Sequence, residues 1–194
     1  MTTLNTDWDR LVAAFRDATM VDTYYLNTRT GKLLYHNPRK LGAARAQKVE
    51  ERVFEEEDWI EIPYVESDEE FAAMEAFASS GAAGEAREAL HSAITSDKPF
   101  RRFREALRQA PGAAAAWEEE RLRAALDRLV DFCEALEIEI DHPAFAALRS
   151  AARGEATLAP ASSLSIGRGA SPAPKAPRPP RMGAGPRVSG PRGR

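Results

Sequence analysis

The spacing of hydrophobic residues changes several times along this chain, which predicts a mixture of helices and strands. A first helix should begin near Asn5 or Thr6, because either side chain can cap its N-terminus. One face of this helix carries apolar residues at the i, i+3, i+4, i+7 spacing: Trp8, Leu11, Val12 and Phe15. Residues 39–52 show only a weak helical pattern around Gly42, so we expect a loop or a poorly formed helix there.

A small antiparallel sheet is predicted from two segments. Apolar and polar residues alternate over 21–26, the turn 28–31 contains a glycine, and a second β-rich run ends at His36, so residues 21–36 should form a hairpin. Residues 59–63 supply a third strand, which ends or lies at an edge because Pro63 has no backbone N–H to donate. Aromatic residues on such strands pack across the sheet more often than they stack on a ligand, and we interpret three of them in this way: Tyr24, Tyr35 and Trp59.

Helical spacing dominates after residue 66. Ser67 and Glu70 match a capping box, which predicts a helix start, and the helix behind it has an apolar side formed by Phe71, Met74 and Phe77. The next helix has Leu90 and Ile94 as its apolar pair. Ser96 or Asp97 should cap a further helix, with Pro99 in its first turn, where a missing N–H is tolerated.

A long helix is predicted over about residues 113–136, followed by a strand at Ile138–Ile140 and a short helix at 143–152. The core face of the long helix should contain Trp117, Leu122, Leu126, Leu129, Val130 and Cys133. The predicted fold class is therefore α+β, with a small antiparallel sheet packed against several helices in one domain over residues 1–152.

Charge divides the chain into two parts. Residues 151–194 contain eight basic residues and one acidic residue, a formal charge of +7, whereas residues 1–150 carry −10. The C-terminal part also holds 8 of the 13 prolines and 7 of the 12 glycines. Few large apolar residues are available there to offset the entropy of ordering, so residues 153–194 are predicted to be a disordered Pro/Gly/Arg-rich tail. The tail could hold nucleic acid, bind the acidic body or act only as a solubilising appendage.

The sequence contains no recognisable motif for metal binding, nucleophilic catalysis or phosphate binding. The three histidines, His36, His91 and His142, lie on different predicted elements without a partner at ligand spacing, so we predict no metal site. Cys133 has no neighbouring base and should behave as a small buried hydrophobe, and no glycine-rich phosphate loop occurs. The acidic run 55–58 could bind a cation, but a solvated charge run is the better interpretation.

We therefore predict no catalytic residue and no cofactor, and the sequence favours a non-enzymatic protein. The N-terminus lacks the apolar segment of a signal peptide, and no stretch of about 18 apolar residues occurs. These two observations predict a cytoplasmic protein without a membrane span.

The segment 98–108 is the best candidate for a binding surface. In a helix, its apolar residues form one stripe: Phe100, Phe103 and Leu107. A row of cations lies beside that stripe: Lys98, Arg101, Arg104 and Arg108. The planar guanidinium fork donates two hydrogen bonds at once, so this row could bind an acidic protein or a nucleic-acid backbone. The alternative is structural, because Glu118, Glu119 and Glu120 follow closely and could pair with the row across a helix–helix contact.

Several segments together resemble the bacterial proteins catalogued as uncharacterised protein family 0158. The residues that carry the resemblance are Val21-Asp22, Thr30 to Leu33, Trp59 to Pro63, Ser67 to Phe77, Lys98 to Phe103, Trp117 and Leu136 to Ile138. The resemblance covers about residues 21–140 and implies a small α+β domain. It supplies no reaction and no catalytic residue, and it marks Phe100, Phe103 and Trp117 as hallmark positions.

The function that the sequence favours is a non-enzymatic binding module with an arginine-lined helix face for an acidic partner, either a protein or a nucleic acid. The tail could assist that binding. Two alternatives stay open: a small-ligand binder or enzyme whose pocket is assembled from scattered residues, or an arginine row that is purely structural. The sequence does not indicate an oligomeric state.

Overall fold

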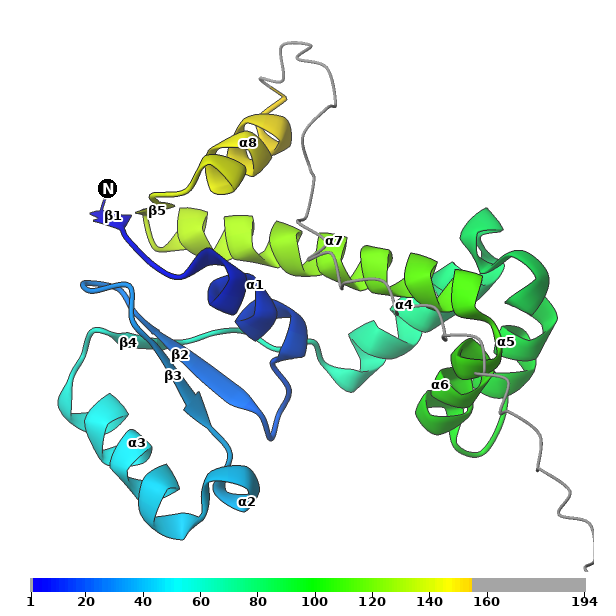
Figure 1. Cartoon of the computed structure of the whole chain (residues 1–194), viewed down its shortest axis with the longest axis horizontal. Coiled ribbons are helices and arrows are strands. Elements are labelled where there is room, and N and C mark those ends of the chain that lie inside the picture. The colour runs from blue at the N-terminus through cyan, green and yellow to red at the C-terminus, as the bar shows by residue number, and fades with distance from the viewer. Residues whose placement is uncertain (1, 155–194) are drawn as a thin grey trace, which may run out of the picture. The chain divides into compact units, whose positions relative to one another are not determined.

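The structure is a computed structural model that describes residues 2–154 of the 194-residue chain (Figure 1). Within that range the fold is α+β, as predicted, and its elements in chain order are β1 (Thr2–Leu4), α1 (Trp8–Asp17), β2 (Thr23–Asn27), β3 (Leu33–His36), α2 (Pro38–Leu41), α3 (Ala43–Glu55), β4 (Trp59–Glu61), α4 (Ser67–Ser79), the 3-10 helix η1 (Gly81–Ala86), α5 (Arg87–Ile94), α6 (Pro99–Gln109), α7 (Pro111–Ala135), β5 (Ile138–Ile140) and α8 (Pro143–Ala152). The predicted disordered tail, beyond its first two residues, lies outside the described residues.

The predicted three-stranded antiparallel sheet is confirmed, with strand order β3-β2-β4. Tyr24 pairs with Tyr35 across the hairpin, and their rings are in contact with centroids 5.1 Å apart, so the cross-strand interpretation of these aromatics is confirmed. Leu26 lies opposite Leu33 on one neighbour and Ile60 on the other. The sheet lies between α1 on one side and the α2–α3 pair on the other (Figure 1).

A second, two-stranded sheet joins the two ends of the described chain. β1 and β5 pair in parallel, with Thr2 opposite Ile138 and Leu4 opposite Ile140. The strand at 138–140 was predicted, but β1 was not. Leu4, Ile138 and Ile140 are all buried, so this pair closes one side of the core.

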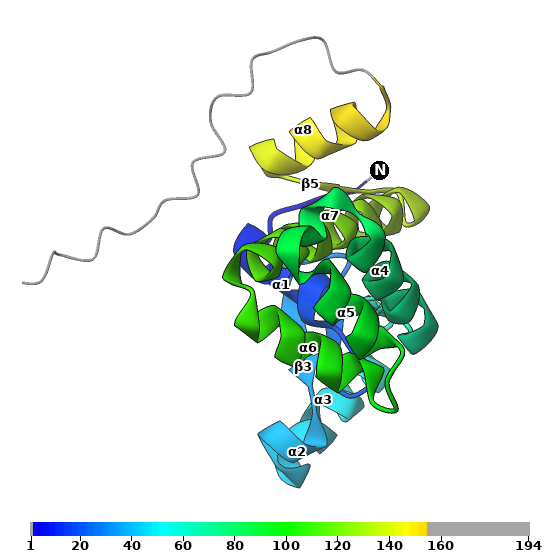
Figure 2. The ribbon, with the colours of Figure 1, turned by 90° about the vertical axis from the view of Figure 1, so that its right-hand side faces the viewer.

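Buried apolar residues form two clusters, and α7 contributes to both. The first, which we call the α/β cluster, contains residues of β1, α1, β2, β5, α8 and the C-terminal half of α7: among them are Leu11, Phe15, Leu26, Leu129, Cys133 and Phe145. The second, the helical cluster, contains residues of α4 to α6 and the N-terminal half of α7: among them are Met74, Phe77, Leu90, Phe103, Leu107 and Trp117. Figure 2 shows α4, α5 and α6 gathered around that end of α7.

The predicted N-caps of α1 and α6 are wrong by one or two residues. Asp7 caps α1 by accepting a hydrogen bond from the Arg10 amide, while the Thr6 hydroxyl donates to the Gly31 carbonyl in the hairpin turn instead. α6 begins after Lys98 without a side-chain cap, because the Ser96 hydroxyl donates to the Ala93 carbonyl at the end of α5.

The capping box at the start of α4 does not form. Glu66 is the N-cap in an extended conformation, which makes Ser67 the first helical residue. The Ser67 hydroxyl therefore makes no capping bond. The positive end of the helix dipole is stabilised instead by the charges of three acidic residues in the first turn: Asp68, Glu69 and Glu70.

Two further expectations are corrected by backbone and packing details. Residues 38–55 form two helices and not a loop or a poor helix, because Gly42, at φ 79° and ψ 152°, adopts a glycine-specific conformation that separates α2 from α3. In α7, Leu122 and Leu126 are only half-buried, and Ala125, between them in sequence, is fully buried.

Candidate functional site

α6 carries the predicted arginine row and is held in place by its apolar stripe. Phe103 and Leu107 are buried at 1% and 6% exposure, and Phe100 is half-buried with its ring 6.3 Å from that of Phe71. The Phe103 ring also meets Trp117 of α7 edge-on at 5.2 Å and Phe77 of α4 at 6.4 Å. These contacts fix which side of α6 faces inward, so the opposite side faces solvent.

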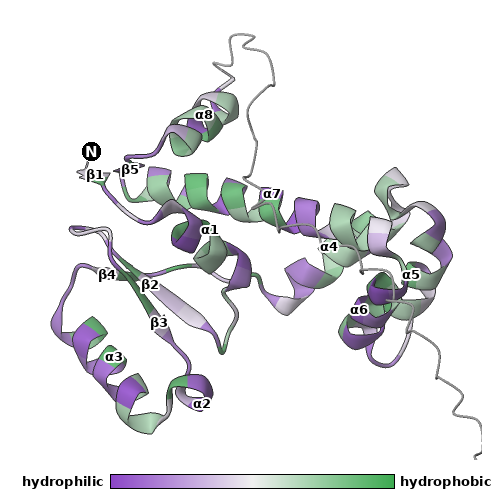
Figure 3. Cartoon of the chain, viewed as in Figure 1, coloured by the Kyte–Doolittle hydropathy of each residue, from purple (hydrophilic) through white to green (hydrophobic). Residues whose placement is uncertain are grey.

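The cations of this segment are all exposed: Lys98, Arg101, Arg102, Arg104 and Arg108. We call this set, together with the side of α6 that carries it, the α6 face; its only acidic residue is Glu105, and Figure 3 colours most of α6 as hydrophilic. Arg101 and Arg102 both pair with Glu105, at 2.9 and 3.5 Å. The hydrogen bond from Arg101 holds the pKa of the Glu105 carboxyl below its usual value.

The side chains of Arg104 and Arg108 make no hydrogen bond and no ion pair with any other residue in the described part of the chain. The alternative that the row pairs with Glu118 to Glu120 is not seen within residues 2–154. Glu118 pairs with Arg121 at 3.4 Å and Glu120 pairs with Arg123 at 2.9 Å, both along α7 itself. The α6 face is thus a cationic surface on a strongly acidic body.

A second feature, which the sequence did not predict, is a cleft of about 450 Å³ between the end of α1, the start of α4 and the middle of α7. Figure 1 shows these three elements converging. The apolar part of its lining includes Trp117, Ala124, Ala73 and Ala18. Its charged part contains residues of both signs: Arg16, Arg121 and Arg128, with Glu69 and Glu70 of α4 and Glu120 and Asp127 of α7.

Two of these arginines also terminate α1. Arg128 donates a hydrogen bond to the Phe15 carbonyl at 2.8 Å, and Arg121 donates one to the Arg16 carbonyl at 3.2 Å. The last carbonyls of a helix have no partner within the helix, and cations there are favoured by its dipole. The sequence signal for this arrangement was the i, i+7 spacing of Arg121 and Arg128, which places both on one side of α7.

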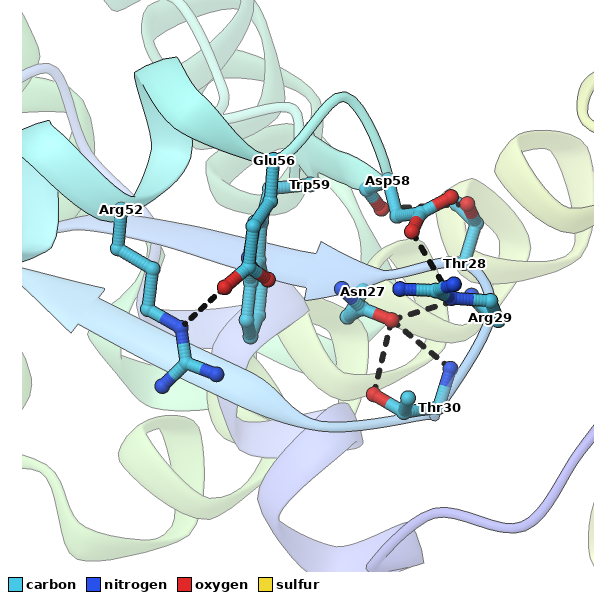
Figure 4. Close-up of polar contacts among 8 residues, drawn as sticks. All are labelled: Asn27, Thr28, Arg29, Thr30, Arg52, Glu56, Asp58 and Trp59. Carbon is cyan, nitrogen blue, oxygen red and sulfur yellow. Dashed lines mark hydrogen bonds and ion pairs between the residues drawn. The ribbon is translucent and has the colours of Figure 1, made fainter.

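Two carboxylates of the acidic run 55–58, Glu56 and Asp58, contact neighbouring side chains (Figure 4), while Glu55 and Glu57 are exposed. Glu56 accepts hydrogen bonds from Trp59 Nε1 at 2.8 Å and from Arg52 at 3.2 Å, and the Arg52 guanidinium lies 5.3 Å from the centre of the Trp59 ring. Asp58 pairs with Arg29 of the hairpin turn at 3.0 Å. Within residues 2–154 no group of three or more potential ligand side chains could hold a metal ion.

A buried amide side chain, that of Asn27, contributes to holding the hairpin turn beside this run. The Asn27 side-chain oxygen accepts hydrogen bonds from the Arg29 and Thr30 amides and from the Thr30 hydroxyl (Figure 4). Asn27 is 2% exposed, so these bonds satisfy a polar group that would otherwise be costly to bury.

The three histidines lie apart, in β3, in α5 and at the start of α8. His36 pairs with Glu50 at 2.9 Å, His142 accepts from the Ala144 amide and stacks on Trp8, and His91 is exposed on α5. The buried Cys133 is also confirmed, and burial raises the pKa of its thiol to about 12. An inert thiol is therefore expected in the native state.

Comparisons of the chain with protein-family models, with curated proteins and with solved structures found no match. The resemblance to uncharacterised protein family 0158 therefore stays a prediction. None of the helices within residues 2–154 has the length and hydropathy needed to cross a membrane.

Proposed function

We propose that this protein is a non-enzymatic binding module whose α6 face binds an acidic partner, and that the partner is a nucleic acid. The observation that supports the proposal is the state of Arg104 and Arg108. Both are exposed, and neither forms an ion pair with a carboxylate of the described chain, although that chain carries an excess of acidic residues.

The spacing of the row suits a phosphate backbone. Arg101 and Arg108 lie seven residues apart on α6, which places their Cα atoms about 10 Å apart along the helix axis. Arg104 lies between them on the same side. Three guanidinium groups along such a line can each contact a different phosphate, and these contacts carry affinity without sequence preference.

The test is fluorescence anisotropy with labelled duplex DNA and labelled single-stranded RNA, using the full chain at about 50 and 200 mM salt. The variant R101Q/R104Q/R108Q should retain the fold, because all three side chains are exposed. If each contacts one duplex phosphate, the variant should lower the slope of log K against log salt by about 2.7. Raising the salt from about 50 to about 200 mM should therefore weaken binding by the wild-type chain about 40-fold more than binding by the variant.

A matched control removes the same charge elsewhere. Arg10, Arg39 and Arg45 are exposed and make no ion pair within residues 2–154, so R10Q/R39Q/R45Q has the same net charge as the α6 variant. Only the α6 variant should lose binding. Equal losses in both would show a general charge effect and contradict the proposed surface, and no binding by the wild-type chain at the lower salt would overturn the nucleic-acid partner.

The contribution of the basic tail is measured in a full-length chain. In this variant every basic residue after 156 is replaced by Gln: Arg168, Lys175, Arg178, Arg181, Arg187, Arg192 and Arg194. Binding that survives this change and is lost in the α6 variant supports the α6 face as the primary site. Binding lost only with the tail charges would contradict it.

A further inference from the structure

The cleft between α1, α4 and α7 is lined by charged groups of both signs. On the α7 side Arg121 and Arg128 lie beside Glu120 and Asp127, and on the α4 side the lining has Glu69 and Glu70. Trp117 and Ala124 of α7 add apolar surface to the lining. The volume of about 450 Å³ lies within the usual range of small-molecule sites.

Arg128 differs from the other two arginines of the cleft in having no counter-ion. Arg16 forms two hydrogen bonds to Asp17, at 2.8 and 3.0 Å, and Arg121 lies 3.4 Å from Glu118. Within residues 2–154 no carboxylate lies within 4.0 Å of Arg128, and its Nε atom is buried without a hydrogen-bond partner. Burial also lowers the pKa of this guanidinium. Apart from its hydrogen bond to the Phe15 carbonyl, this half-buried charge has no ion pair within the described residues, which is unfavourable, so the position favours an anionic group of a ligand.

The opposite wall favours a cationic group. Glu69 and Asp127 are close enough for their charges to act on Arg128, but neither forms an ion pair with it. Neither Glu69 nor Glu70 makes a side-chain hydrogen bond within the described residues. A simple anion would be repelled by these carboxylates, and a simple cation would be repelled by the arginines.

We infer that this cleft binds a free zwitterionic α-amino acid with an apolar side chain. The ligand carboxylate binds Arg128, the ammonium group binds Glu69, and the side chain packs on Trp117 and Ala124. This site is separate from the α6 face, and its failure would leave the proposed nucleic-acid binding untouched.

The test uses ligands that differ by one charge. L-phenylalanine is titrated into the full-length protein by calorimetry, with 3-phenylpropanoate, which lacks the ammonium group, and phenethylamine, which lacks the carboxylate, as analogues. The zwitterion should bind at least tenfold more tightly than either analogue. No heat from L-phenylalanine at about 10 mM, where a Kd of 1 mM gives near saturation, would overturn the inference, as would equal binding of all three ligands.

Variants then test which wall of the cleft binds which group of the ligand. E69Q should weaken L-phenylalanine binding several-fold and leave 3-phenylpropanoate binding no weaker, whereas a purely structural effect would weaken both. R128K retains a donor for the Phe15 carbonyl. It should weaken the binding of L-phenylalanine and leave the binding of phenethylamine unchanged. A124F should block all three ligands by filling the cleft, and the control E119Q, exposed on α7 outside the cleft, should change nothing. Binding that survives A124F unchanged would place the ligand elsewhere and contradict the inference.

Discussion

Gly31, in the hairpin turn, is the position where the backbone tolerates a side chain least. Its φ is +69°, and an added Cβ would lie 2.4 Å from the Asn5 carbonyl oxygen and 3.3 Å from the Thr6 Cβ. The Thr6 hydroxyl also donates a 2.7 Å hydrogen bond to the Gly31 carbonyl. The substitution G31A must therefore displace the segment that leads into α1.

Three contributions add up in this variant. The left-handed backbone disfavours alanine by about 1–2 kcal/mol. Loss of the Thr6 hydrogen bond removes about 0.5–1.5 kcal/mol, and the displaced backbone adds strain of about 1 kcal/mol. We therefore expect G31A to lower the free energy of unfolding by about 3–4 kcal/mol.

Gly154 provides a matched control, since its φ is +67° but nothing lies within 4 Å of an added Cβ. G154A should cost no more than the backbone contribution, about 1–2 kcal/mol. Urea unfolding followed by circular dichroism measures both variants against the wild type. If G31A is no less stable than G154A, the close approach between the hairpin turn and residues 5–6 does not exist and the reasoning fails.

Three further predictions concern the core and its titratable groups. F103A should destabilise the fold by about 3–5 kcal/mol in urea unfolding, and R104A, its exposed neighbour, by no more than about 0.5 kcal/mol; similar losses would show that α6 is turned differently. Asp22 accepts hydrogen bonds from Lys40, Tyr35 and Asn37, which lower its pKa from 3.8 to about 2. Because the folded state favours the carboxylate, this stabilisation is complete above pH 4 and is lost as the pH falls towards 2. D22N should remove about 1 kcal/mol of that pH-dependent stability, allowing for partial exposure, and an unchanged acid profile would refute the network. Cys133 should resist thiol reagents at pH 8 until the chain unfolds, and rapid labelling of the native protein would contradict its burial.

The predictions that succeeded depend on local spacing. The Phe100, Phe103, Leu107 stripe identified the inward side of α6, because residues three and four apart share a helix face. The hairpin followed from alternation on both sides of a glycine-containing turn, and β5 followed from the alternation of Ile138 and Ile140.

The features that were missed depend on residues far apart in sequence. β1 is only three residues long and exists because it pairs with a strand more than 130 residues away. The helix starts were misplaced because the Thr6 and Ser96 hydroxyls bond to neighbouring elements instead of their own helix. The cleft requires three elements to converge, and no local pattern indicates such a site.

The sharing of α7 between two clusters has a consequence for how the protein unfolds. The helical cluster is built almost entirely from residues 74–117, a contiguous segment, whereas the α/β cluster brings Leu4 against Ile140. Contacts between residues close in sequence re-form quickly after they open. A contact between residues as far apart in sequence as Leu4 and Ile140 re-forms slowly. Amide hydrogen exchange should therefore divide α7 near its middle, so that one long helix belongs to two cooperative units with separate opening free energies.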